Sequence, residues 1–202
     1  AIFLALGNAY FQGKKYAEAI EKLIKAPESQ EVNGMLGLAY YHQEAFDKAL
    51  PQLCKAVDQG STDADIFSAR AEIYLQQEKF TEAQKDFENS LSLGKNDAKN
   101  YTGLGRTHFY LNQFEEAAKA LSTAIQKGAA EAEVYYCRGN ARAALGQYSG
   151  ALPDLNKAVS GAKSDALTYK NIGKAEYILK NYQGAIDGLS KAIDQGESSA
   201  EV

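Results

Sequence analysis

The segment 103–106 reads Gly-Leu-Gly-Arg, a glycine pair followed by a base. These residue types can form a phosphate-binding loop, because glycines let the backbone N–H groups approach a phosphate and a base holds its negative charge. A single segment of this kind is a weak signal. It indicates a nucleotide site only if the glycines have no other role in the fold.

Cysteines and histidines are the other side chains that could carry out chemistry. Cys54 and Cys137 lie 83 residues apart, without the Cys-x-x-Cys spacing of a metal or redox site. Arg138 could lower the pKa of the adjacent Cys137 thiol, but a carboxylate partner for this arginine would weaken that effect. His42 and His108 have no carboxylate pattern around them, which favours packing or surface roles. We therefore predict no catalytic residue, no metal site and no cofactor.

The composition is typical of a soluble folded protein. Hydrophobic residues make up 45% and charged residues 24% of the 202 residues. The formal net charge of −4 gives no general attraction to nucleic acid or to anionic membranes. No apolar stretch is long enough to span a bilayer, and no secretory signal is visible. The compartment is not determined, although two unpaired thiols favour a reducing one such as the cytoplasm.

Self-similarity explains the glycines of 103–106. Small residues recur at intervals of 30 and then 34 residues, at Gly7, Gly37, Ala71, Gly105, Gly139 and Gly173. Aromatic residues follow nine positions later, at Tyr16, Phe46, Phe80, Phe114, Tyr148 and Tyr182. Alanines come three positions after these, and mostly leucines four positions after the alanines. A phosphate loop would not recur in this way. A small residue once per helical pair is a packing position that lets two helices approach closely.

Each copy predicts two helices. Apolar residues at helical spacing mark the first helix, as at 101–108, and a short polar break precedes the second, as at 114–124. The second helix usually ends at a glycine, which accepts the left-handed turn after a helix C-terminus. These predicted turn glycines are Gly60, Gly94, Gly128, Gly161 and Gly196.

The segment YTGLGRTHFYLNQFEEAAKALSTAI, at 101–125, resembles a tetratricopeptide repeat, whose pattern is W-x2-L-G-x2-Y, then A-x3-F, then A and P. Here Tyr or Phe replaces the opening Trp, and the closing Pro is absent. The resemblance covers essentially the whole chain and implies an all-α fold, a right-handed superhelical solenoid of six tandem helix-turn-helix repeats in one domain, 1–202. The repeats run over about 1–29, 30–63, 64–97, 98–131, 132–165 and 166–199, and 200–202 would begin another.

Neither end of the chain carries an evident polar cap, although repeat arrays need such caps. We therefore expect the chain to be a piece of a longer array.

Two arginines occupy positions at which the family pattern has an inward-facing leucine. Arg70 and Arg138 would be buried, and a buried unpaired charge costs several kcal/mol, so each needs a partner. Only these two copies carry an aspartate sixteen residues later, at Asp86 and Asp154. We predict two structural ion pairs, Arg70–Asp86 and Arg138–Asp154, that hold the two helices of their repeats together.

The resemblance also implies a protein-interaction scaffold without catalysis, because the concave face lined by first helices is the usual binding surface of such arrays. Residues one, four and eight places into each first helix share this face. In the first half these are Ala1, Leu4, Asn8, Glu31, Gly34, Leu38, Asp65, Ser68 and Glu72, with a formal charge of −3. In the second half they are Lys99, Thr102, Arg106, Glu133, Tyr136, Asn140, Leu167, Lys170 and Lys174, with +4 − 1 = +3.

Aromatic side chains beside amides and bases suit an extended peptide. We predict that the second-half groove binds a peptide segment or partner domain with an acidic segment, and that the first-half groove prefers a basic one. Asn140 and Asn171 match two positions of the family's carboxylate clamp, but Tyr136 stands where that clamp has Lys, so a complete clamp is not predicted. The predicted groove residues are Lys99, Arg106, Phe109, Tyr136, Asn140, Lys170, Asn171, Lys174 and Tyr177.

Three alternatives stay open at this stage. The charges of the grooves could be simply solvated. The chain could associate with copies of itself or with further repeats. It could also be the regulatory arm of an enzyme whose catalytic domain lies outside this sequence.

Overall fold

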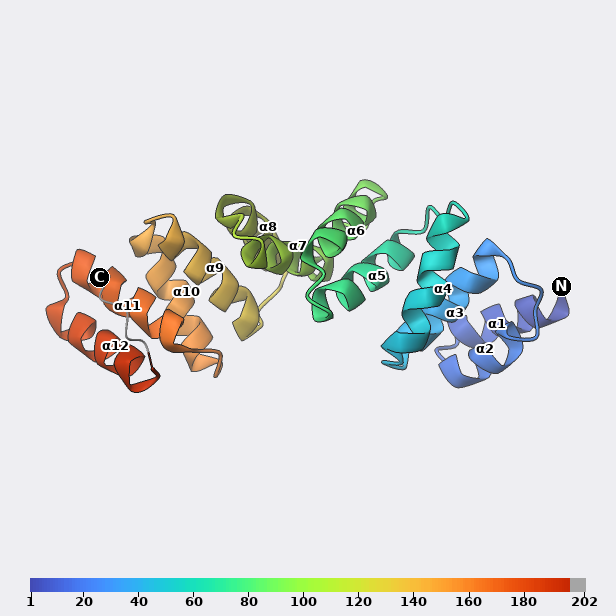
Figure 1. Cartoon of the computed structure of the whole chain (residues 1–202), viewed down its shortest axis with the longest axis horizontal. Helices are drawn as coiled ribbons and strands as arrows, with labels where there is room; N and C mark the ends of the chain where they lie inside the picture. The colour runs from blue at the N-terminus through green and yellow to red at the C-terminus, as the bar shows by residue number, and fades with distance from the viewer. Residues whose placement is uncertain (197–202) are drawn as a thin grey trace. The chain divides into compact units, whose positions relative to one another are not determined.

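The computed structural model describes residues 1–196, which form α-helices joined by short turns (Figure 1). The described residues contain no strand. The helices are α1 (Ile2–Gln12), α2 (Tyr16–Leu23), α3 (Gln30–His42), α4 (Phe46–Asp58), α5 (Ala64–Gln76), α6 (Phe80–Ser92), α7 (Ala98–Tyr110), α8 (Phe114–Gln126), α9 (Ala132–Ala144), α10 (Tyr148–Ser160), α11 (Ala166–Ile178) and α12 (Tyr182–Asp194). The predicted all-α architecture of helix pairs is confirmed. The predicted start of another repeat at 200–202 and the end of the sixth repeat lie outside the described residues.

Consecutive helices pair as hairpins, one for each predicted repeat. We refer to the odd-numbered helices as first helices and to the even-numbered ones as second helices. Within a stack, each first helix contacts both helices of the preceding hairpin, as α3 contacts α1 and α2, and as α11 contacts α9 and α10. Each repeat therefore buries its apolar face against its nearest neighbours, which is how repeat proteins form a continuous core.

The contacts divide the chain into two compact units, residues 1–96 and 97–202. This boundary falls between the third and fourth predicted repeats, so each unit holds three of them. The arrangement of 1–202 as one continuous solenoid stays a prediction.

The alanine and leucine columns of the second helices form the core of each unit. The residues of these columns without any exposed surface are Ala19, Leu23, Ala49, Leu53, Ala56, Ala83, Phe87, Ala117, Leu121, Ala124, Ala151, Leu155 and Ala158. Full burial of a leucine or phenylalanine side chain contributes about 1.5–3 kcal/mol. The columns that recur in the sequence are thus residues that stabilise each hairpin.

The recurring glycines lie where the first and second helices of a hairpin approach most closely. A Cβ atom added to Gly105 would lie 2.5 Å from the Leu121 side chain, and one added to Gly139 would lie 2.9 Å from the Leu155 side chain. No side chain can occupy this space unless the leucine moves. The segment 103–106 lies inside α7, so its backbone N–H groups serve the helix and do not form a phosphate loop.

Polar side chains cap the N-termini of four first helices. The side-chain oxygens that accept hydrogen bonds from the helices following them belong to Ser29, Asp63, Asp97 and Asp165. A cap of this kind is typically worth about 1 kcal/mol. These residues fix where the first helices begin, and two of them, Asp63 and Asp165, also contribute to the sites described below.

From the second repeat on, the turn after the second helix contains a residue in the left-handed conformation. Gly60, Gly94, Gly128 and Gly196 have φ angles of +88°, +98°, +102° and +95°. In the fifth repeat this residue is Ala162, with φ +60°, whereas Gly161 has φ −89°. The prediction that Gly161 supplies the turn is therefore wrong. A Cβ on Gly161 would lie 2.5 Å from the Cβ of Ala132, so glycine is needed there for close packing.

Substitution of Gly139 by alanine should lower the free energy of unfolding by about 1–3 kcal/mol, because the new methyl group collides with Leu155. Gly150→Ala, in the second helix of the same hairpin, is the matched control. Its new Cβ would meet nothing closer than 3.7 Å. It should raise stability by up to about 1 kcal/mol, because alanine favours helix over glycine. Urea unfolding followed by far-UV circular dichroism measures both changes, and equal effects of the two substitutions would contradict this account.

Ala162→Gly should raise the free energy of unfolding by about 0.5–1 kcal/mol. A non-glycine residue in the left-handed conformation costs about 1–2 kcal/mol, and the extra flexibility of glycine in the unfolded chain offsets part of the gain. The reverse change at the equivalent turn, Gly128→Ala, should lower stability. Thermal unfolding of the two variants tests this expectation, which a destabilised Ala162→Gly variant would refute.

Candidate functional site

The first helices of the second unit line a cavity of about 280 Å³. Three successive repeats contribute to it, from the end of α7 with the following turn and the start of α8, from the second half of α9, and from the first half of α11. The lining residues are Phe109, Tyr110, Asn112, Phe114, Asn140, Ala144, Leu167 and Asn171. Three predicted groove residues, Phe109, Asn140 and Asn171, therefore lie together at this cavity.

Two asparagine amides from neighbouring repeats form its polar side. Asn171 Nδ2 donates a hydrogen bond of 2.8 Å to Asn140 Oδ1, and Asn140 Nδ2 donates one of 3.0 Å to the Tyr136 carbonyl oxygen. Asn140 is only 2% exposed, so these bonds satisfy a buried amide. Because an amide has one acceptor oxygen and one NH2 group, this chain of bonds leaves Asn171 Oδ1 as an acceptor for a ligand at the cavity.

Aromatic rings form the apolar side of the cavity. The Phe109 ring lies 6.2 Å from that of Phe114 and 6.0 Å from that of Tyr136, centroid to centroid, with edge-to-face or tilted geometry. Tyr136 is 8% exposed, and its hydroxyl donates a 2.7 Å hydrogen bond to Asp165 Oδ2. Burial and this bond to Asp165 raise the pKa of Tyr136 above its ordinary value. Tyr136 thus packs against the Phe109 ring as a buried side chain, and it is not exposed to anchor a peptide.

The predicted basic residues lie outside the lining of this cavity. Arg106 Nε lies 3.7 Å from Glu133 Oε1, and Lys163 Nζ lies 2.8 Å from Glu133 Oε2, so one carboxylate faces two bases. Lys99 is exposed near the start of α7.

The remaining predicted groove residues lie on α11. Lys170 and Lys174 are half-buried on either side of Asn171 in the sequence. Tyr177 is exposed, and its ring lies 6.1 Å from the Tyr182 ring. These three residues do not line the cavity.

The structure brings the two predicted arginine–aspartate pairs together. Arg70 donates two hydrogen bonds to Asp86, of 2.6 Å from Nε and 2.8 Å from Nη2, and Asp86 is 1% exposed. Arg138 donates two to Asp154, of 2.8 Å from Nε and 2.7 Å from Nη2. Each bidentate pair joins the first and second helices of one hairpin, α5 to α6 or α9 to α10.

The sequence analysis did not predict that a second arginine, Arg142, also binds Asp154. Arg142 Nη1 donates hydrogen bonds of 2.8 Å to Asp154 Oδ2 and 3.1 Å to the Gly150 carbonyl oxygen. Arg138 also donates a 3.2 Å hydrogen bond to Ser122 Oγ. The sequence contains a signal for the Arg142–Asp154 contact. Residues four apart on a helix share a face, and Arg142 follows Arg138 at that spacing.

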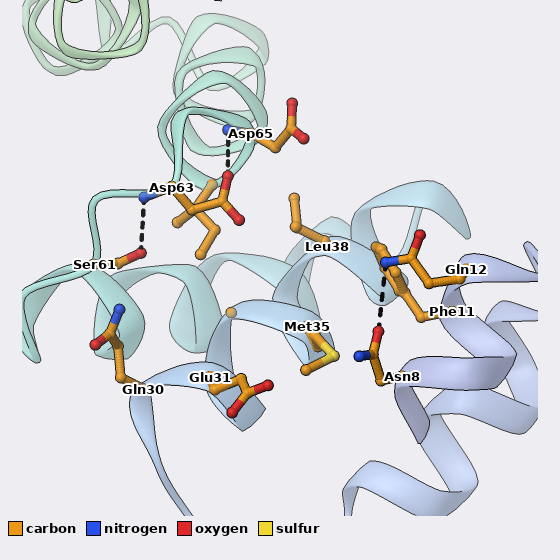
Figure 2. Close-up of a pocket in the computed structure, with 12 residues that line it drawn as sticks. Asn8, Phe11, Gln12, Gln30, Glu31, Met35, Leu38, Ser61, Asp63 and Asp65 are labelled. Carbon is orange, nitrogen blue, oxygen red and sulfur yellow. Dashed lines mark hydrogen bonds between the residues drawn. The ribbon is translucent and has the colours of Figure 1, made fainter. Parts of the chain in front are cut away.

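The first unit has a larger cavity of about 380 Å³ on its first helices (Figure 2). The spacing rule for the groove placed five of its lining residues on this face: Asn8, Glu31, Gly34, Leu38 and Asp65. The lining residues outside that rule are Phe11, Gln12, Gln30, Met35, Ser61, Asp63 and Ile66. Asp63 was not foreseen because it precedes α5 as its N-cap and belongs to no helix face.

Cys137 and both histidines are held in packing or hydrogen-bond contacts. Cys54 and Cys137 are both free. Burial, and secondarily Glu133, raise the pKa of Cys137, so its thiol stays protonated and unreactive. His108 is buried and hydrogen-bonds to Gln113, while His42 stacks on the Tyr16 ring at 4.5 Å.

The described residues show neither a metal-ligand cluster nor a membrane-spanning helix. They contain no group of three histidine, cysteine or carboxylate side chains close enough to hold a metal ion. None of their helices has the length and apolar character to cross a membrane.

Asp86→Ala should lower the free energy of unfolding by about 3–5 kcal/mol, because it leaves the Arg70 guanidinium buried without its partner. The double variant Arg70→Leu/Asp86→Ala carries the residues that the fourth repeat has at these positions, Leu104 and Ala120. It should be less destabilised than the single variant. A double-mutant cycle by urea unfolding measures the coupling between the two residues. Additive losses in the double variant would show that the pair has no net interaction.

Family models match most of the chain. A model described as tetratricopeptide repeat matches residues 4–64, 102–166 and 138–200, and one described as SHNi-TPR matches residues 64–95. No curated protein sequence matches the chain.

Solved structures of tetratricopeptide repeat proteins have a similar fold. The crystal structure of YrrB, described as a TPR protein with an unusual peptide-binding site, is 23% identical with a TM-score of 0.69, over 90% of this chain and 92% of that one. The MamA structure labelled MSR-1 is 16% identical with a TM-score of 0.67, over 82% of this chain and 95% of that one. Such identities show similarity of fold alone. Because the tetratricopeptide repeat model matches more than half of its length, the chain belongs to the tetratricopeptide repeat family.

Proposed function

We propose that this protein is an interaction module that holds an extended peptide segment of a partner against its first helices, and that it acts by binding and not by catalysis. One observation carries the proposal. In each unit, three successive first helices line a cavity in which a phenylalanine of the first of them, Phe11 or Phe109, lies beside polar amide side chains.

The chemistry of the second-unit cavity suits a peptide. An extended peptide presents backbone N–H groups and side chains at regular intervals, so it can use an acceptor and an apolar pocket at the same time. Asn171 Oδ1 supplies the acceptor, and Phe109 with Leu167 supplies the apolar surface. The cavity volume of about 280 Å³ is near the lower limit of about 300 Å³ for small-molecule pockets. It therefore fits one anchoring side chain of a larger ligand.

The similarity to YrrB supports the same class of ligand, since that protein is described as having a peptide-binding site. The identity of 23% transfers no residue to this chain. The choice of contact residues therefore rests on the cavity alone.

For the second unit we infer a peptide with acidic residues next to its apolar anchor. The cavity lining contains no carboxylate, and Lys170 and Lys174 lie on the same helix as Asn171. Bases beside an uncharged pocket attract an acidic segment and orient it, while the apolar anchor and the amide hold it in place. The lysines contribute to binding through their charge and do not form the pocket itself.

Two labelled peptides that share an apolar anchor test this proposal, one flanked by Asp and Glu and the other by Asn and Gln. In fluorescence anisotropy, the acidic peptide should bind about three- to tenfold more tightly, because each exposed charge contact is worth about 0.2–1 kcal/mol. Lys170→Glu/Lys174→Glu should remove this preference. Asn171→Ala should weaken the binding of both peptides equally.

The matched control is Lys119→Glu/Lys191→Glu, which makes the same change of charge on the second helices α8 and α12. It should leave binding unchanged. Equal loss in the two double variants would mean that only net charge matters and would contradict the assigned site. Failure of both peptides to bind would overturn the proposed function, and a concentration-dependent mass in light scattering would then favour self-association.

A further inference from the structure

The cavity of the first unit differs from that of the second in its charge. Three carboxylates, Glu31, Asp63 and Asp65, are among its lining residues, and none of the lining residues is a lysine or arginine. The lining of the second-unit cavity contains no acidic residue. The two units therefore use the same first-helix face to build sites of different chemistry.

An apolar surface lies among these carboxylates. Phe11 and Met35 are half-buried, and Leu38 and Ile66 are almost fully buried beneath the cavity. Figure 2 shows Asp63 on the side of α5 and Glu31 on the side of α3, with the Leu38 and Met35 side chains also facing this space. A ligand that combines an apolar part with a positive charge would complement this cavity.

The three carboxylates differ in the ion pairs and hydrogen bonds that they already form within the protein. Asp65 forms an ion pair with Lys95. Asp63 Oδ1 accepts a 2.8 Å hydrogen bond from the Asp65 backbone N–H, which leaves Oδ2 to face a ligand. Glu31 has no ion-pair partner among residues 1–196. Helix capping and the helix dipole explain the acids at position 63 and in the first turn of α3, but they do not explain the apolar cavity beside them.

The spacing of the carboxylates argues against a metal ion. In the described part of the chain, no three potential metal ligands come together. Glu31 instead lies in the first turn of α3, whereas Asp63 is the N-cap of α5, and the two residues border the cavity from two sides. A guanidinium group suits exposed carboxylates beside an apolar surface, because its planar fork of five N–H donors pairs with carboxylate oxygens and is only weakly hydrated.

We infer that this cavity receives an arginine side chain from a basic segment of a protein partner. The methylene stem of the arginine lies on Met35 and Leu38, as long basic side chains do on apolar surfaces. Its guanidinium group lies near Phe11 and donates to Glu31 and Asp63, which combines a cation–π contact with charge-assisted hydrogen bonds. This inference rests on the proposed function and adds the identity of the side chain that the first unit recognises.

Three short labelled peptides that differ only at a central residue test the inference, with arginine, lysine or citrulline at that position. Citrulline has nearly the shape of arginine but no charge. In fluorescence anisotropy, the arginine peptide should bind at least about tenfold more tightly than the citrulline peptide, with lysine between them. The difference should shrink as salt is added, because a charged contact is screened.

The variant Glu31→Gln/Asp63→Asn should bind the arginine peptide as weakly as the citrulline peptide. Asparagine at position 63 can still cap α5, so the variant should keep the fold, which circular dichroism checks. Glu18→Gln/Asp47→Asn is the matched control, since it removes two acids from the first turns of the second helices α2 and α4. It should leave arginine binding unchanged.

Equal binding of the arginine and citrulline peptides would overturn the inference, and so would an unchanged affinity of Glu31→Gln/Asp63→Asn. No binding of the arginine peptide up to about 1 mM would overturn it as well. The acidic peptide used for the second unit separates the two levels of failure. If that peptide binds while the arginine peptide does not, only this inference fails; if neither binds, the proposed function fails with it.

Discussion

The close approach of the two helices within each hairpin is the constraint on which the rest of this structure depends. The leucine of the second helix packs directly against the backbone of the first, in space that a side chain on the small residue would occupy. This contact sets the spacing of the helix pair and, through the stacking of pairs, the position of every first helix in a unit. The third repeat keeps the arrangement with different residues, because Ala71 stands at the glycine position and Phe87 at the leucine position, both completely buried.

The arginine–aspartate pairs show how much variation this frame accepts. At the position of Arg70, the second and fourth repeats have Leu36 and Leu104, which are buried apolar side chains. Arg70 places a charge at this position. Asp86, on the second helix of the same hairpin, neutralises that charge and accepts two hydrogen bonds from it. Such a pair is weak evidence for extra stability, since an apolar pair can serve equally well. Its clearer consequence is that the two helices become dependent on each other, because neither charge can be buried alone.

Because packing uses the small residue and the leucine columns, the other face of the first helices is free to carry different chemistry in each repeat. In the second unit this face presents an amide pair and an aromatic wall. In the first unit it presents carboxylates around an apolar surface. One frame therefore supports two cavities whose lining residues differ in charge.

The repeat period is sufficient to predict the helices, the buried columns and the aspartate that faces each buried arginine, because these features follow from spacing within a single repeat. The period also placed Glu31, Leu38 and Asp65 on the face that lines the first cavity. Helix caps and turns were predicted less well, as at positions 63 and 162, because they depend on single residues at helix ends.

The composition of the second site was decided by contacts between successive first helices, including the residue that caps the later helix. Tyr136 had the position of a groove residue, but Asp165, 29 residues later, holds its hydroxyl and draws it into the packing. Asn171 is joined to Asn140 across 31 residues, and this pairing selects which amide atoms remain for a ligand. No spacing rule within one helix can foresee such bonds, because they depend on which side chains two stacked helices bring within about 3 Å of each other.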